Sequence, residues 1–466
     1  MSPVIARFTP GIMPPEVLET FFVSRQPILD ALVQRAEEAA TGVNQHHTLI
    51  VGPRGSGKTH LLTMAYNRVQ GLADQGARLR VVRLPEDPWT IVSYGHFLQA
   101  ITSALGSDTT NEQDCEAWLV TSAMDLGTVV VFAENLDRIL TQIGVQGQAR
   151  LRRLLQTSDA LLMLASTTTL DRNLATSSKP FYCFFTTIRL NPLSIEEARQ
   201  MLKSIARVRE DTDLEIYLDT PQATARLATI ALIAGSQPRV WASLANMMSV
   251  DSFTSLTDLL IHAFDDLVPC YQEQMAGLAP QQRLVVAELA RANHPLHVAA
   301  LAERLGMDPK SAARTVIQLK NMHWLSEVRP GFGRPVDKRR TYYELAEPMT
   351  RFILQVKDGC EQKIASMVDF LILWFSGKDD PRACEASYDN CCDMINHLTD
   401  ALACLIHPAN NDVCMSLPTV LRTAVEESPN VEMLQQTTAA FLDCVGRHDE
   451  AEILRLGAIE RGATSA

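Results

Sequence analysis

VGPRGSGKTH, residues 51–60, is the stretch that decides the fold. It fits the pattern GxxxxGK[ST], which begins at Gly52 and ends on Lys58 and Thr59. Apolar residues 49–51 before it predict a short buried strand, and the apolar spacing after it predicts a helix. A glycine-rich loop between a strand and a helix is typical of the phosphate-binding loop of nucleotide-binding proteins. We therefore expect an α/β P-loop core built on a parallel sheet.

The residues of this loop have separate roles in binding a nucleotide. Glycines let successive backbone N–H groups curl around the β-phosphate, and the dipole of the following helix adds positive potential. We expect Lys58 to reach the β- and γ-phosphates and Thr59 to supply a hydroxyl ligand to Mg²⁺. The sequence therefore predicts ATP and Mg²⁺ as ligands. The residues expected to contact the nucleotide are Gly52, Pro53, Arg54, Gly55, Ser56, Gly57, Lys58, Thr59 and His60.

TVVVFAENLDRIL, residues 128–140, should carry the second acidic motif of such a site. Residues 129–132 are β-branched or aromatic, which predicts a buried parallel strand. An acid at the end of that strand would hold Mg²⁺ through water, and the next residue would polarise the attacking water. In one alignment Ala133 takes the metal position and Glu134 is the catalytic base. In the other, which we favour, Glu134 holds the metal and Asn135 replaces the base.

The choice between these alignments decides the expected rate of ATP hydrolysis. Asparagine cannot accept a proton at neutral pH, although it can orient a water molecule. With Asn135 in the catalytic position, hydrolysis to ADP and phosphate should be slow and nucleotide retention long. With Glu134 there instead, the base is kept and the contact with the metal is weaker. We expect a slow ATPase whose catalytic residues are Lys58, Glu134 and Asn135.

Several further stretches, taken in order, resemble the AAA+/STAND group of P-loop ATPases, in particular bacterial ATP-binding proteins related to origin initiators and archaeal-type ATPases. FFVSRQPILDAL, residues 21–32, resembles the FVGRExEL box that precedes the P-loop, with Ser24 where glycine is usual. IRLNPLSIEEARQML, residues 188–202, resembles the entry to a helical lid. AGSQPRVWASLANMM, residues 234–248, resembles the GGxPR element of that lid, and the resemblance implies Arg239 as a second sensor of the nucleotide.

The resemblance also bears on the acidic motif and on two other features of the site. It places Leu136 and Asp137 at the end of a DELD-like motif, which favours Glu134 as the acid that holds the metal. It implies that a polar residue at the end of the apolar stretch ALLMLASTTT, residues 160–169, senses the γ-phosphate. The candidates are Ser166, Thr167 or Thr168 for this sensor and Arg152, Arg153 or Arg189 for an arginine finger.

Residues 278–328 have the pattern helix, helix, turn, helix and strand. Leu284, Val285 and Leu289 mark the apolar face of the first helix in this interpretation. Gly306 ends the second helix, and Asp308-Pro309 caps and begins the third. The following residues predict a strand, a Gly/Pro-rich loop and another strand, so the segment resembles a MarR-like winged helix-turn-helix. The third helix should expose Lys310, Ser311, Arg314, Thr315 and Gln318, opposite Ala312, Val316 and Leu319.

This segment is a basic island in an acidic chain. The net charge of the whole chain is −12, whereas residues 308–340 carry eight Lys or Arg against three acidic residues. In a DNA-binding interpretation, the third helix enters the major groove and the loop after it contacts phosphates. The alternative is a packing or partner-docking module without DNA. The expected DNA contacts are Lys310, Arg314, Arg334, Lys338, Arg339 and Arg340.

Together these features predict four domains. They are a P-loop ATPase core at 1–190, a helical lid at 191–266, a winged helix-turn-helix at 267–356 and an all-α, tetratricopeptide-like C-terminal domain at 357–466. We expect this last domain to bind a protein partner or to form a homo-oligomer; the alternative is a packing extension without a partner. No signal-peptide pattern and no membrane-spanning apolar run is visible, so we expect a cytoplasmic protein. The expected function is an ATP-binding switch that couples nucleotide state to DNA binding. The alternatives are a signalling or oligomerisation scaffold, and an oligomeric ATPase remodeller.

Overall fold

The computed structural model divides the chain into two compact units. The described residues are 13–42, 45–168, 170, 172–245, 247–265, 268–292, 295–322, 324–328, 340–357, 368 and 372. The first unit comprises Met1–Pro192 with Gln237–Arg239, and the second comprises Leu193–Ser236 with Val240–Ala466. The expected C-terminal helical domain lies outside the described residues, apart from Lys357, Val368 and Ile372. The four-domain scheme therefore stays a prediction.

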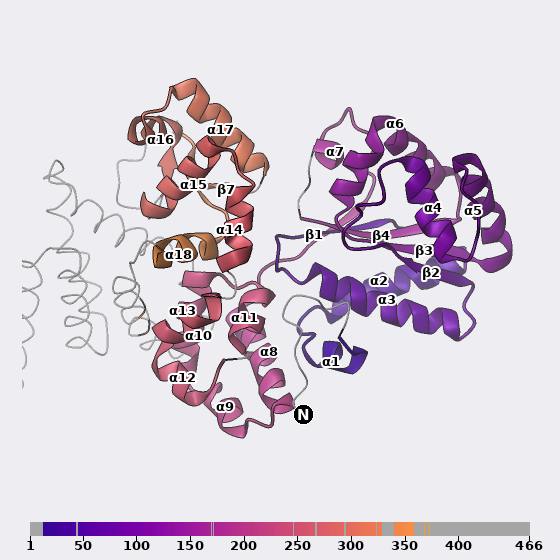
Figure 1. Ribbon diagram of the computed structural model, residues 1–466. Helices are drawn as coiled ribbons and strands as arrows, with labels where there is room; N and C mark the ends of the chain where they lie inside the picture. Colours follow the sequence, from indigo (N-terminus) through magenta and orange to yellow (C-terminus); the bar gives the residue numbers. More distant parts are fainter. Residues whose placement is uncertain are drawn as a thin grey trace, which may run out of the picture. The chain divides into compact units, whose positions relative to one another are not determined.

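A five-stranded parallel sheet forms the centre of the first unit (Figure 1). Its strands are β1 (Thr48–Val51), β2 (Leu79–Arg83), β3 (Thr128–Ala133), β4 (Leu161–Thr167) and β5 (Thr186–Arg189). They lie in the order β2-β3-β4-β1-β5, and every neighbouring pair is parallel. The strand before the P-loop and the strand before Glu134 are therefore not neighbours, because β4 lies between them. The predicted α/β core with a parallel sheet is confirmed.

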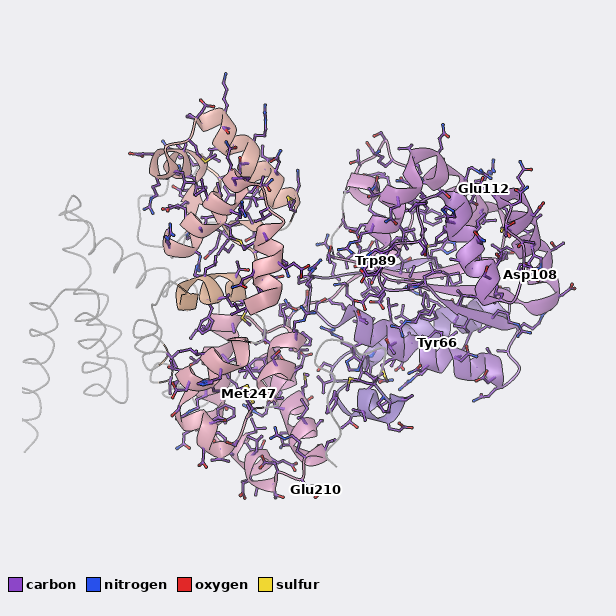
Figure 2. The ribbon with its side chains drawn as sticks, viewed as in Figure 1. Tyr66, Trp89, Asp108, Glu112, Glu210 and Met247 are labelled. Atoms are coloured by element: carbon purple, nitrogen blue, oxygen red, sulfur yellow. The ribbon has the colours of Figure 1, made fainter. Side chains whose placement is uncertain are left out.

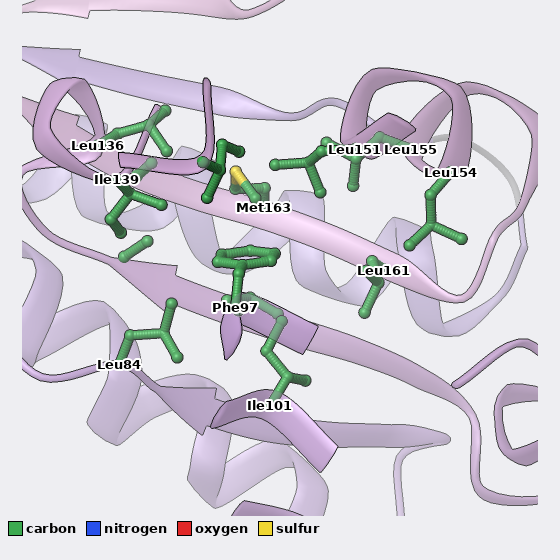
Figure 3. Packing of buried hydrophobic residues seen from close by; sticks show 14 of the residues in the cluster. Leu84, Phe97, Ile101, Leu136, Ile139, Leu151, Leu154, Leu155, Leu161 and Met163 are labelled. Atoms are coloured by element: carbon green, nitrogen blue, oxygen red, sulfur yellow. The ribbon is translucent and has the colours of Figure 1, made fainter. Parts of the chain in front are cut away.

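Helices cover both faces of this sheet, as Figure 1 shows. The helices of this unit are α1 (Pro15–Thr20), α2 (Gln26–Ala40), α3 (Lys58–Asp74), α4 (Tyr94–Ala104), α5 (Glu112–Leu126), α6 (Leu136–Thr157) and the short α7 (Arg172–Ala175). On one face, α4 and α6 pack against β3 and β4 through side chains such as Phe97, Ile139 and Met163 (Figure 3). On the other face, α2 and α3 pack through a second buried cluster that contains Leu29 and Leu61.

The alternation of side chains along β3 explains how one strand serves both layers. Every residue from Thr128 to Ala133 is buried. Val129, Val131 and Ala133 belong to the cluster under α4 and α6, whereas Val130 and Phe132 belong to the cluster under α2 and α3. Tyr66 of α3, labelled in Figure 2, sets its ring edge against Phe132 at a centroid distance of 5.7 Å. A strand buried on both faces must be apolar throughout, as its sequence predicts.

The first part of the second unit is helical, as expected for the segment after the core. Its helices are α8 (Ile195–Val208), α9 (Thr212–Tyr217), α10 (Pro221–Ala234), α11 (Pro238–Ala245), α12 (Val250–Thr254), α13 (Leu256–Asp265) and α14 (Val268–Ala276). A capping box begins α8: Ser194 accepts from the backbone N–H of Glu197, and Glu197 accepts from that of Ser194. The first two residues of α11 group with the first unit.

The second part of this unit combines helices with a small antiparallel sheet. The elements are α15 (Pro280–Ala292), β6 (Leu296–His297), α16 (Val298–Leu305), α17 (Pro309–Asn321), β7 (Leu325–Val328), β8 (Tyr342–Leu345) and α18 (Pro348–Lys357). The strands lie in the order β6-β8-β7. Gly306 ends α16 with φ +60°, and the Asp308 carboxylate caps α17 by accepting from the backbone N–H groups of Lys310 and Ser311. Both predicted boundaries are confirmed.

Two predictions about the faces of these helices are wrong. Leu284 was expected in the core of α15, but it is 51% exposed, and Val285, Val286 and Leu289 are buried instead. Thr315 was expected on the exposed face of α17, but it is buried, and its hydroxyl donates to Ser311 O at 2.9 Å. A threonine whose hydroxyl bonds to its own helix can present its methyl group to the core.

Among the described residues, no helix combines the length and the apolar character that a membrane span needs.

Candidate nucleotide-binding site

The P-loop connects the end of β1 to the start of α3 in a conformation that depends on glycine. Gly55 has φ +78° and Gly57 has φ +84°, both in the left-handed region that residues with a Cβ rarely adopt. A Cβ on Gly55 would lie 2.9 Å from the Cβ of Arg239. The loop leads directly into Lys58 and Thr59, the first two residues of α3. Unpaired backbone N–H groups at a helix start attract phosphate.

Lys58 is held at the loop with its charge largely buried. Its ammonium group donates to Gly52 O at 2.7 Å and to Pro53 O at 2.9 Å. Burial lowers the pKa of Lys58 to about 8; Glu134 raises it, and Arg239 and Arg54 lower it. The lysine is therefore a cation in a poorly solvated place, where a phosphate would relieve the cost of burying its charge.

Arg25, which the sequence analysis did not single out, braces the loop. Its guanidinium donates to Ser56 O and, at 3.3 Å, to Asn191 O. The preceding Ser24 has φ +61°, which explains why glycine is usual at that position of the box. The side chain of Ser56 is fully buried, and its Oγ has no hydrogen-bond partner in the described part of the chain. An unsatisfied polar atom inside the loop is consistent with a site shaped for a polar ligand.

Of His60 and Arg239, both expected to contact the nucleotide, only Arg239 has a hydrogen bond to the P-loop among the described contacts. The His60 ring bonds to Leu18 O at 2.9 Å and packs against Phe22, and burial lowers its pKa to about 4. Its side chain thus anchors α1, and a contact with the nucleotide stays a prediction. Arg239 is brought to the loop, since its backbone N–H donates to Gly55 O at 3.2 Å.

Glu134 is the carboxylate that meets the P-loop. It is 5% exposed, and its Oε2 accepts from the hydroxyl of Thr59. Its Oε1 accepts from Nη2 of Arg83 at 3.2 Å. Ala133 is completely buried in the other layer, under α4 and α6, and does not face Thr59. Period-two alternation accounts for this difference, because Phe132 and Glu134 point to the α3 side of the sheet.

Asn135 is at the N-cap position of α6, but its side chain does not cap the helix. It has φ +52° and ψ +45° at the start of α6, a left-handed conformation that asparagine tolerates better than most residues. Its side chain makes no capping bond to the helix, and Nδ2 donates instead to Glu86 O at 2.9 Å. The side-chain amide of Asn135 therefore tethers the loop that follows β2.

β4 lies between β1 and β3, and its carboxyl end carries polar groups beside the ends of those two strands. Thr167, at the end of β4, donates to Oδ1 of Asp137 at 2.9 Å. Ser166 is buried, and its Oγ has no hydrogen-bond partner among the described residues. Thr168 follows in a bend. Of the arginine-finger candidates, Arg152 donates to Pro180 O, while Arg153 and Arg189 are exposed.

The residues expected to contact DNA divide into two groups. Lys310 and Arg314 are exposed on α17, and Arg340 is exposed just before β8, where its guanidinium lies 3.0 Å from Nε2 of His297. Arg334, Lys338 and Arg339 lie outside the described residues. The structure thus places half of the predicted set on the surface of the second unit.

No protein-family model matches this chain, and no curated protein matches it. Among solved structures, the ORC2 protein of Aeropyrum pernix in ADPNP–ADP complexes is similar, with 15% identity and a TM-score of 0.50 over 73% of this chain and 98% of that chain. The ORC1 protein of the same organism in complex with DNA has 14% identity and a TM-score of 0.45, covering 76% and 96%. The RuvB Holliday junction branch migration motor of Thermotoga maritima has 18% identity and a TM-score of 0.36, covering 66% and 90%.

The first of these similarities concerns the fold. It spans nearly the whole ORC2 chain, so the parallel core and the helices after it follow one architecture in both proteins. Together with the P-loop and the strand order, this gives the chain a parallel α/β P-loop fold similar to that of the ORC2 protein.

Proposed function

We propose that this chain is an ATP-binding switch of the AAA+/STAND type that hydrolyses ATP slowly. One observation carries the proposal: Glu134 contacts Thr59, and the residue after it is an asparagine whose side chain is bonded to a backbone carbonyl. This favours the alignment in which Glu134 holds the metal. The position of the catalytic base then belongs to Asn135.

The residues present fit a magnesium nucleotide. Mg²⁺ is usually held by one or two carboxylates together with substrate phosphates, and Thr59 with Glu134 offers a hydroxyl and a carboxylate in direct contact. When bound, Mg²⁺ would neutralise charge on the β- and γ-phosphates. Lys58 would exchange its two P-loop carbonyls for phosphate oxygens, and the N–H groups at the start of α3 would hold the β-phosphate. The orphaned Ser56 Oγ lies within the same loop.

The amide of Asn135 explains why hydrolysis should be slow. A positioned general base contributes about 10²–10⁴-fold to a rate, and an amide cannot take the proton. The Asp137 carboxylate accepts a hydrogen bond from Thr167, at the end of β4 where we expect the γ-phosphate sensor. We therefore do not assign it as a substitute base. Bound ATP would therefore persist, and the ATP-bound and ADP-bound forms would be two long-lived states of the protein.

Restoring a carboxylate at the catalytic position tests this proposal. Asn135→Asp is the conservative choice, because aspartate also tolerates the left-handed backbone of this position. We expect the single-turnover rate of ATP hydrolysis to rise by about tenfold or more, since part of the general-base contribution returns. Asn135→Ala, which removes the amide without adding a base, is the matched control and should not accelerate the reaction. Equal rates for Asn135→Asp and wild type would contradict the assignment.

A second part of the proposal is that the nucleotide state controls DNA binding by a winged helix. It is supported by the arrangement of α15, α16 and α17 with the β6-β8-β7 sheet, and by exposed Lys310 and Arg314 on α17. Cationic side chains at phosphates make affinity fall with salt. Lys310→Ala/Arg314→Ala should weaken binding to double-stranded DNA and flatten its salt dependence.

A matched double variant controls for the change of charge. Arg304→Ala/Lys320→Ala removes two cations from the same segment, but these are paired with Glu288 and Glu327. It should bind DNA as wild type does. Equal loss in both double variants, or no salt-dependent binding by wild type, would favour the scaffold alternative, in which the segment docks a protein partner.

A further inference from the structure

Arg83 and Thr59 together occupy both oxygens of the Glu134 carboxylate. Thr59 Oγ1 donates to Oε2, and Nη2 of Arg83 lies 3.2 Å from Oε1. The Glu134 side chain is 6% exposed, and that of Arg83 is 26% exposed. An ion pair this poorly solvated is stronger than a surface pair, because water screens it less.

The sheet register determines this contact. β2 and β3 are neighbouring parallel strands, and Arg83 lies opposite Phe132. Directly opposed residues point to the same face, and Glu134 follows Phe132 by two positions, so Arg83 and Glu134 share the α3 side of the sheet. The same alternation puts Leu79 and Val81 in the cluster under α2 and α3. The alternation along β2 thus directs Arg83 to the carboxylate.

Arg83 and a divalent cation would compete for the carboxylate of Glu134. Glu134 is the carboxylate that contacts Thr59, the P-loop hydroxyl expected to bind the metal. A buried carboxylate needs a counter-charge, and the guanidinium already provides one. Lys58 and Glu86, one of each sign, also interact electrostatically with Glu134. The Lys58 ammonium donates to backbone carbonyls, whereas the Arg83 guanidinium forms an ion pair with Glu134 directly.

We propose that Arg83 sets the metal dependence of the nucleotide site by neutralising Glu134 in place of a divalent cation. The inference rests on the proposed binding of ATP and ADP. With the carboxylate neutralised, the phosphates of a metal-free nucleotide meet little repulsion. The same guanidinium repels an incoming divalent cation and weakens its binding. Nucleotide affinity should consequently depend little on Mg²⁺.

The test compares nucleotide affinity with and without metal in the full chain. The probe is N-methylanthraniloyl-ADP, titrated once in excess EDTA and once in excess Mg²⁺. For wild type, the dissociation constant in EDTA divided by that in Mg²⁺ should lie within about threefold of one. In Arg83→Gln this ratio should rise by about tenfold or more, which corresponds to about 1.4 kcal/mol. Binding of Mn²⁺ to the ADP complex, followed by its electron paramagnetic resonance signal, should tighten by a similar factor.

Two further variants make the result specific. Arg80→Gln removes an exposed arginine of the same strand, which lies on the alternate face and donates to Leu79 O at 3.2 Å. It should keep the wild-type ratio. Arg83→Met retains an apolar stem that packs as the arginine stem does, so it has the same expected ratio as Arg83→Gln and replaces it should that variant fail to fold.

The outcomes separate this inference from the proposed function. Probe binding by wild type with an unchanged metal ratio in both Arg83 variants would overturn the inference and leave nucleotide binding intact. A wild-type affinity that collapses in EDTA would also overturn it. If wild type binds no probe under either condition, the proposed function fails and the inference fails with it.

Discussion

Replacing Lys58 with methionine should change how the stability of the nucleotide-free protein depends on pH. The lysine is 9% exposed, and burial lowers its pKa to about 8 from the ordinary value of 10.5. Below the folded pKa both states carry the proton, and the full cost of burying the charge is present. Between the two pKa values the unfolded chain keeps a proton that the folded chain has lost. The free energy of unfolding therefore rises with pH in that window.

The magnitude follows from the size of the pKa change. Each pKa unit is worth about 1.4 kcal/mol, so the full cost is about 3 kcal/mol, of which about 2 kcal/mol is relieved between about pH 7 and about pH 9.5. Lys58→Met lacks the titrating group. Its advantage in unfolding free energy over wild type should shrink by about 2 kcal/mol across this range. The loss of the bonds to Gly52 O and Pro53 O affects both ends of the range alike.

Urea denaturation in EDTA, without nucleotide, measures this difference. The relevant transition is the one that added ADP moves to higher urea in wild type, because a ligand stabilises the unit that binds it. Lys310→Met removes an exposed lysine and serves as the control, with a difference from wild type that does not change with pH. If the difference for Lys58→Met is constant within about 0.5 kcal/mol, the burial of this charge is not a cost, and the reasoning is refuted.

Four further substitutions test the backbone conformation and the packing of the two units. Gly127→Ala should lower the unfolding free energy of the first unit by about 3 kcal/mol or more in urea denaturation, because φ is +89° and a Cβ would lie 2.0 Å from Arg78 O. Ser24→Gly should raise it by up to about 1 kcal/mol, since φ is +61° there; a loss of stability would contradict the strain. Leu284→Ala should cost under about 0.5 kcal/mol and Leu289→Ala about 2–5 kcal/mol, and equal costs would contradict their different burial.

The sequence predicts the P-loop and the strand before Glu134 because their signals are local. Glycines followed by lysine and threonine fit one loop geometry, and the wholly apolar run at 129–132 fits a strand with both faces covered. The caps of α16 and α17 are equally local, since Gly306 and Asp308 satisfy groups within their own helix ends. Each of these predictions requires only residues that are neighbours in the chain.

The missed features depend on partners that are distant in the chain. Arg83 and Glu134 meet only because β2 pairs with β3 in one register, which periodicity along either strand does not reveal. Leu284 begins the apolar run Leu-Val-Val, and such a run does not indicate which of its members faces the core. The position of β4 between β1 and β3 likewise comes from the pairing of strands and not from their composition.

The same reasoning applies to Asn135. Its place after Glu134 is visible in the sequence, and the chemistry of an amide predicts slow hydrolysis. The left-handed backbone and the bond to Glu86 O required the structure, because Glu86 lies in the loop after another strand. This bond gives the amide a tethering role beside the catalytic one that the proposal assigns to the position.

A single-turnover measurement tests the central claim most directly. Wild-type protein in excess over ATP would be quenched at intervals, and the ADP formed and the nucleotide still bound would be quantified. Enzymes commonly turn over about 10 times per second, so the loss of a general base worth about 10²-fold predicts about 0.1 per second or slower. The ADP should also stay bound after hydrolysis. Turnover of several ATP per second that Asn135→Ala does not alter would contradict it.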